Sequence, residues 1–164
     1  MLNFRTLEFD YSLYISLASI AGIFVGFAAL ITASDDDNSP ALIKGIVNIG
    51  MLTLAGALIP VLLAEYGIKE EFMWRLSSAL FFSLIWFSLL HPTTRKFLVI
   101  QFKMDLKAAL FFWICIEIPI QLPLVLAITG AFPAIHDAFF MTSIILNLIQ
   151  AGYLIVQFVH APRK

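Results

Sequence analysis

Five long apolar runs restrict the fold of this chain more than any other feature of its sequence. They cover residues 11–33, 42–63, 72–90, 108–129 and 138–159. Each has about the 17–25 residues that an α-helix needs to cross roughly 30 Å of hydrocarbon. The runs are continuous rather than alternating, which favours helices over a membrane β-barrel. The sequence therefore predicts an all-α integral membrane protein, in which residues 1–164 form one bundle of about five transmembrane helices without a soluble domain.

The composition agrees with a bilayer as the solvent. Of the 164 residues, 61% are hydrophobic and 13% are charged, against roughly 45–50% and about 25% in soluble domains. A formal net charge of −1 argues against a nucleic-acid partner. The single cysteine, Cys115, excludes an intrachain disulfide.

The basic residues predict how the bundle is oriented. With five spans, three basic residues lie on the amino-terminal side and seven on the carboxy-terminal side. Lys and Arg are in excess in cytoplasmic loops. We therefore expect an external amino terminus and a cytoplasmic carboxy terminus, in a plasma or bacterial inner membrane. The inference requires the third run, which carries Arg75, to span. The two groups are Arg5, Lys69 and Arg75, and Lys44, Arg95, Lys96, Lys103, Lys107, Arg163 and Lys164.

Glu117 lies near the midpoint of the fourth run. A charge at the centre of a bilayer costs at least roughly 2.5–3.5 kcal/mol, so an ionisable residue there is a functional hypothesis by default. Gln121 follows four residues later, on the same face of a helix. A carboxyl group that changes its protonation state within the membrane is what a proton relay or a cation site requires.

Prolines are expected to interrupt two of the helices. Pro119 and Pro123 lack the N–H groups that would bond to the carbonyls of Cys115 and Pro119, so a kink is predicted in the fourth helix. Pro60 frees the carbonyl of Gly56 in the second helix in the same way. These three prolines are the predicted hinges, and freed carbonyls beside a carboxylate form an oxygen-rich pocket.

Other helices supply polar residues that must avoid lipid. On the fifth helix, four residues recur at spacings that keep one face polar, and Asn48 lies on the second helix. These residues either join helices by hydrogen bonds or line a hydrated path. The predicted ion or proton site consists of Glu117, Gln121, Asn48, Asn147 and Gln150. The fifth-helix face is Ser143, Asn147, Gln150 and Gln157.

Small residues on the first helix predict close helix packing. A GxxxG motif, Gly22 to Gly26, belongs to a longer small-residue stripe that includes Ser19. In lipid, such a stripe lets helix backbones approach closely. The partner is either a helix of the same chain or a neighbouring copy, and Gly56 is a further packing residue on the second helix. The stripe is Ser12, Ser19, Gly22, Gly26, Ala29 and Ala33.

The segments between the runs carry weaker signals. Residues 35–37 are three consecutive aspartates, interpreted as a solvated turn because they lack the ligand spacing of a calcium loop. Residues 91–107 mix basic and apolar residues, as in an amphipathic elbow at the inner interface, where a cytoplasmic partner could also dock. The three histidines fall near helix ends on different sides, which argues against one shared metal site; they are His91, His136 and His160.

Two functions compete on these residues. The first is an oligomeric channel or transporter subunit with a mid-membrane cation or proton site at Glu117. The second is a structural, assembly or signalling subunit whose intramembrane polar residues specify helix packing. No nucleophile–base set or phosphate-binding loop is present, so an enzyme is not expected. We also expect no cofactor and no metal site.

Overall fold

The computed structural model describes residues 11–34, 40–90 and 113–160, and every regular element in those ranges is a helix. The expected runs 11–33, 42–63, 72–90 and 138–159 correspond to α1, α2, α3 and α7. The fourth run is described only from residue 113 onward, as η1 and α6. The elements are α1 (Tyr11–Ser34), α2 (Pro40–Glu65), α3 (Glu70–Leu90), η1 (Trp113–Glu117), α6 (Ile118–Thr129), η2 (Pro133–Ile135) and α7 (His136–His160).

Four of the described helices are long and apolar enough to cross a membrane. These spans are Ser12–Leu30, Ile43–Glu65, Phe72–Leu90 and Pro133–Val156, and a shorter apolar helix covers Ile114–Thr129. The prediction of an all-α membrane protein is confirmed, and five helices fit the structure. The third run, on which the predicted orientation depends, is long enough to span.

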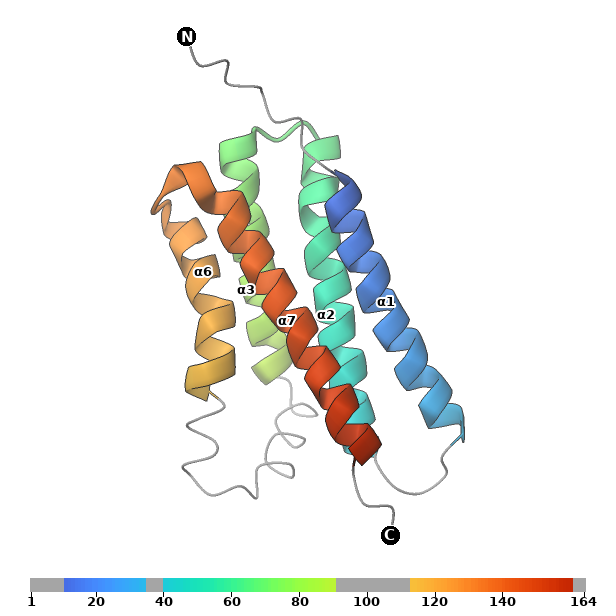
Figure 1. Ribbon diagram of the computed structural model, residues 1–164. Helices are drawn as coiled ribbons and strands as arrows, with labels where there is room; N and C mark the ends of the chain where they lie inside the picture. The colour runs from blue at the N-terminus through green and yellow to red at the C-terminus, as the bar shows by residue number, and fades with distance from the viewer. Residues whose placement is uncertain (1–10, 35–39, 91–112, 161–164) are drawn as a thin grey trace.

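The helices alternate in direction (Figure 1), and their contacts define a ring of four described helices with α1 outside it. Contacts join α2 to α3, α3 to α6, α6 to α7 and α7 back to α2, whereas α1 packs mainly on α2. We call the end where α1 begins the upper end and the opposite end the lower end. The described part of α7 finishes at the lower end, opposite to the start of α1 (Figure 1).

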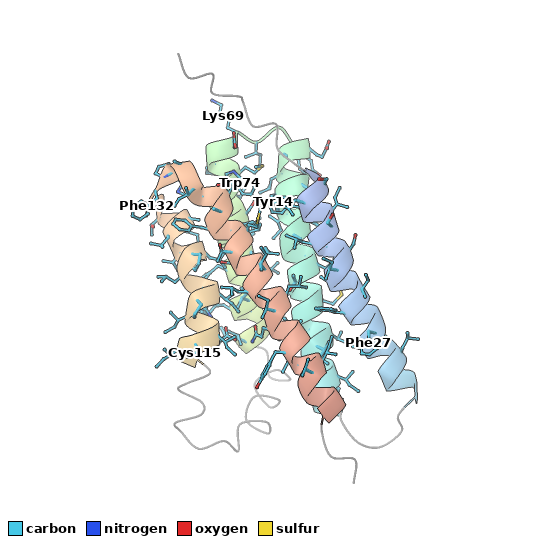
Figure 2. The ribbon with its side chains drawn as sticks, in the orientation of Figure 1. Tyr14, Phe27, Lys69, Trp74, Cys115 and Phe132 are labelled. Atoms are coloured by element: carbon cyan, nitrogen blue, oxygen red, sulfur yellow. The ribbon has the colours of Figure 1, made fainter. Side chains whose placement is uncertain are left out.

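Aromatic side chains fill the upper part of the core. Tyr14 of α1, Trp74 of α3 and Phe140 of α7 are buried, and their ring centroids lie 5.8 to 6.2 Å apart. Figure 2 shows Tyr14 and Trp74 near one another in this region. These aromatic contacts between three helices therefore pack the upper end of α1 against α3 and α7.

Arg75 is accommodated by the turn that ends α6. Gly130 adopts a left-handed conformation (φ +76°), and its N–H donates to the carbonyl of Ala127 at 3.1 Å. A Cβ atom on Gly130 would lie 2.5 Å from an Nη atom of Arg75. The guanidinium group thus lies against the carboxy-terminal end of α6, where the helix dipole favours a positive charge.

The middle of the bundle is packed around a glycine of α2. A Cβ atom on Gly56 would lie 2.6 Å from two ring carbons of Phe81 and 2.8 Å from Cδ1 of Ile144. Both neighbours are fully buried. Gly56, which the sequence marks as a packing residue, therefore lies where side chains of α3 and α7 pack directly against α2, and Pro60 is buried one turn above it.

The face of α1 that packs within the chain is not the one that carries most of the small-residue stripe. Ser19 and Gly26 are exposed, and a Cβ atom on Gly26 would meet nothing within 4 Å. Gly22 is half-buried, and a Cβ atom on it would lie 3.7 Å from Cδ1 of Leu54. The close approach to α2 instead occurs at Gly50, where a Cβ atom would lie 2.7 Å from Cγ2 of Val25. The buried residues of α1 are Tyr14, Leu17, Ala18, Ala21 and Ala28.

Candidate functional site

Glu117 is the last residue of the π-helical turn η1 and directly precedes α6. Its side chain is only 6% exposed. The other acidic side chains that the structure describes, Glu65, Glu70 and Asp137, are exposed. Within the described part of the chain, Glu117 is therefore the one acid held inside the bundle.

The local sequence explains why the helix changes its form at this point. Pro119 is at the start of α6 and has no N–H group to bond to the carbonyl of Cys115. A π-helical turn inserts an extra residue into the hydrogen-bonding pattern, and such turns occur frequently at functional sites. Pro123 lies within α6, which continues past it to Thr129. The bonding changes here from π-helical to α-helical, and the kink itself stays a prediction.

Two glutamine amides hold the carboxylate of Glu117. Nε2 of Gln121 donates to Oε2 at 3.2 Å, and Nε2 of Gln150 donates to Oε1 at 3.2 Å. The first bond lies along one helix, as the spacing of four predicts, and the second joins α6 to α7. Among the described residues, no positively charged side chain contacts this carboxylate. The amides stabilise the carboxylate geometry without neutralising its charge.

The polar face of α7 points toward α6, as its burial shows. Ser143, Asn147 and Gln150 are all buried. The hydroxyl of Ser143 donates to the carbonyl of Ile120 at 2.7 Å, and Ser143 lies two turns above Gln150 on α7. Asn147 lies between these two residues, and its Nδ2 atom has no hydrogen-bond partner among the described residues. The side chain of Gln157 lies outside the described part of the chain.

Asn48 is not brought to Glu117. Its Nδ2 atom donates to Oγ of Ser88 on α3 at 2.6 Å. The physical reason is the order of the helices around the ring, because α2 and α6 face each other diagonally and contact the same two neighbours, α3 and α7. Ser88, buried near the lower end of α3, is a partner that the sequence did not single out, since a lone serine in an apolar run carries no distinctive spacing.

The bonds of Glu117 and of Asn48 lie below the packed layer of Gly56, Phe81 and Ile144. Gln150, which contacts Glu117, lies six residues below Ile144 on α7, about 9 Å along the helix axis at 1.5 Å per residue. The Asn48–Ser88 pair also lies toward the lower end, near the start of α2 and the end of α3. The Glu117–Gln150 and Asn48–Ser88 contacts therefore lie in the lower part of the ring.

A hollow of about 260 Å³ adjoins the carboxylate on the outer face of η1 and α6. It is lined by Glu117, Ile118, Gln121, Leu122 and Val125. All five belong to this one helical segment, so the hollow opens away from the other described helices. Cys115 is exposed nearby, at the lower end of the segment (Figure 2).

Of the remaining candidates, His136 lies away from this site and the others fall outside the described residues. His136 is buried at the upper end, with Nε2 3.2 Å from the carbonyl oxygen of Ala131. Residues 35–37, His91 and the elbow at 91–107 lie outside the described residues, as does the side chain of His160. In the part of the chain that the structure describes, no group of three or more His, Cys, Asp or Glu residues could hold a metal ion.

Comparisons with known proteins add no family assignment to this geometry. No family model, curated protein or solved structure matches the chain. The fold and the site define a helical membrane protein with a carboxylate buried between two of its helices, and its function is inferred from that chemistry.

Proposed function

We propose that this chain is a subunit of an oligomeric channel or transporter that exchanges a proton or a cation at Glu117. One observation carries the proposal: the carboxylate is buried, and its described partners are two neutral amides. A buried carboxylate charge without a positive partner is strongly unfavourable. Since no described residue supplies a positive charge, we infer that a bound proton or a bound cation compensates the carboxylate. A group that gains and loses such a partner is the basis of transport.

The prolines around Glu117 support an oxygen-rich surrounding for this exchange. A kink at Pro119 and Pro123 would leave the carbonyls of Cys115 and Pro119 without their α-helical donors. Interrupted membrane helices use such carbonyls to coordinate ions. Asn147 adds a buried amide that has no partner in the described residues. It lies one turn from Gln150, where it can bind water beside the carboxylate.

A second function is favoured by a different observation. Both carboxylate oxygens accept a hydrogen bond, and one of those bonds joins α6 to α7. The same contacts suit a structural, assembly or signalling subunit in which a protonated Glu117 fixes helix packing. In that case the carboxyl group contributes to stability and not to flux.

Orientation and assembly belong to the same proposal. An external amino terminus would place the lower end, and with it Glu117, toward the cytoplasm of a plasma or bacterial inner membrane. Ser19 and Gly26 on the exposed face of α1 would then pack against a second copy of the chain. A cytoplasmic partner would dock at the elbow of residues 91–107.

The substitution Glu117→Gln separates the two functions. In proteoliposomes loaded with a pH-sensitive dye, or given a monovalent-cation gradient, the transport function predicts at least a tenfold loss of flux with folding intact. Glutamine keeps the size of the side chain and can bond to both amides, but it cannot take up a proton or balance a cation. Glu65→Gln, an exposed acid at the upper end of α2, is the matched control and should leave flux unchanged.

The packing function predicts the opposite pattern for the same residue. Glu117→Gln should then be silent, whereas Glu117→Leu should lower the free energy of unfolding by about 1–3 kcal/mol, because the buried amide of Gln150 loses its acceptor. Equal flux through wild type and Glu117→Gln would reject the transport function.

A further inference from the structure

We propose that the hollow on the outer face of η1 and α6 binds a small hydrophobic ammonium ion from the bilayer, with its positive charge on Glu117. The inference rests on the proposed function, since it names the class of cation that the same carboxylate exchanges for a proton. It adds a ligand and an entry route that the flux proposal does not specify.

The shape of the hollow favours a ligand with a polar head and an apolar body. Glu117 and Gln121 form its polar part, whereas Ile118, Leu122 and Val125 form an apolar part and are 50%, 53% and 39% exposed. The lining extends from Glu117 to Val125, about 12 Å along a helix at 1.5 Å per residue. Its volume, about 260 Å³, falls just below the roughly 300–1,000 Å³ of sites for drug-sized ligands. A small amphiphile therefore fits better than a large one.

The charge of the site selects a cation. The carboxylate has no positively charged partner among the described residues, so an ammonium group would supply the missing counter-charge. A hard metal ion fits less well, because Ca²⁺ takes six to eight oxygen ligands and Mg²⁺ an octahedral set. The hollow instead offers one carboxylate, one amide and three hydrocarbon side chains.

The two carboxylate oxygens have different surroundings. Oε1 accepts from Gln150, which is buried on α7, and Oε2 accepts from Gln121, which lines the hollow. An ammonium ion in the hollow would therefore contact Oε2 while Gln150 keeps Oε1 in place. Because the lining comes from one helical segment and the described helices leave it open, the ligand would enter sideways from the lipid.

A proton and the ammonium ion should compete for the carboxylate of Glu117, so that binding of one excludes the other. The helices packed against α6 are α3 and α7, and their described charged groups, Glu70, Arg75, His136 and Asp137, lie at the upper end. On these helices and η1, the described titratable groups closer to Glu117 are Cys115, two residues before it, and Tyr153, three residues after its partner Gln150, and both are exposed. Binding of a permanently charged ammonium ion should therefore weaken as the pH falls, because protons compete for the carboxylate.

The experiment uses the full chain in lipid nanodiscs, with benzyltrimethylammonium as the probe. Equilibrium dialysis against empty nanodiscs measures binding above partition into lipid. The expected result is saturable binding that is at least tenfold tighter than that of the neutral isostere in which carbon replaces nitrogen. Binding should fall at least tenfold in Glu117→Gln and persist in Glu65→Gln.

A second variant tests the hollow with the carboxylate intact. Leu122→Trp should fill the apolar part and reduce binding at least fivefold, with an unchanged elution profile in size-exclusion chromatography. Binding that is non-saturable, equal for the neutral isostere, or unaffected by Glu117→Gln or Leu122→Trp would overturn the inference. Flux that depends on Glu117 without ammonium binding would reject only this inference. Ammonium binding with Glu117-independent flux would reject only the proposed function.

Discussion

At the scale of single residues, the important feature of the site is that the hydrogen-bond partners of the Glu117 carboxylate are neutral amides and not cations. Gln121 and Gln150 direct N–H groups at Glu117 and leave its net charge unchanged. A lysine or arginine in either position would neutralise that charge permanently. Two amides therefore keep the carboxylate in a fixed position, and in the proposed exchange its counter-charge varies.

The Asn48–Ser88 pair gives a prediction at the same scale. The bond of 2.6 Å joins α2 to α3, and interhelical hydrogen bonds in membranes contribute about 0.6–2 kcal/mol. A double-mutant cycle of Asn48→Ala and Ser88→Ala, measured by unfolding in mixed micelles, should give a coupling energy in that range. The control is a second cycle that pairs Asn48→Ala with Ser83→Ala. Ser83 is exposed and bonds within its own helix, so this cycle should give a coupling energy near zero. A coupling of zero for Asn48 and Ser88 as well would show that the bond contributes nothing.

Individual polar residues could be predicted in part from the sequence. The contact of Gln121 with Glu117 follows from a spacing of four, because residues on one helix have fixed relative positions. The position of Asn48 could not be predicted in the same way. Helix periodicity defines which face a residue occupies, but the order of helices around the ring decides which face it meets.

At the scale of the elements, two glycines that look equivalent in the sequence have opposite surroundings. Gly56 is enclosed by Phe81 and Ile144, whereas Gly26 faces open space within the chain. Gly56→Ala should therefore lower the free energy of unfolding by about 1–3 kcal/mol through overpacking. Gly26→Ala should be neutral or raise it by up to about 1 kcal/mol, since alanine favours the helix. Unfolding of both variants in mixed micelles checks the pair, and equal effects would contradict the packing around Gly56.

The face of α1 illustrates what the sequence leaves undecided about an element. The small-residue stripe and the buried face of α1 both recur at helical spacing, so periodicity alone cannot rank them. Packing selected the face with Ala18, Ala21 and Ala28, because Gly50 of α2 lets the two backbones approach there. The bounds of α1, α2, α3 and α7 followed from apolar length. The π-helical form of η1 did not, because proline predicts an interruption but not how the chain accommodates it.

At the scale of the whole molecule, the alternating helices place the connections at two opposite ends. Tyr66 is exposed in the connection between α2 and α3 at the upper end, and Lys44 is exposed near the lower end of α2. In a Cys115→Ser background, Tyr66→Cys should react with a membrane-impermeant maleimide in intact cells. Lys44→Cys should react only after the cells are permeabilised. The reverse pattern would invert the predicted orientation and would place the lower half, with Glu117, on the outside.

The single thiol of this chain has a practical value that follows from its position. Cys115 is exposed, lies two residues before Glu117 and is the one cysteine of the sequence. A nitroxide or a fluorine label therefore attaches at one defined point without any engineered background. Magnetic resonance can then compare the collision rates of oxygen and of a water-soluble nickel chelate at that label. The native sequence thus already contains an attachment point for following, in real time, whether lipid or water meets the exposed face of η1.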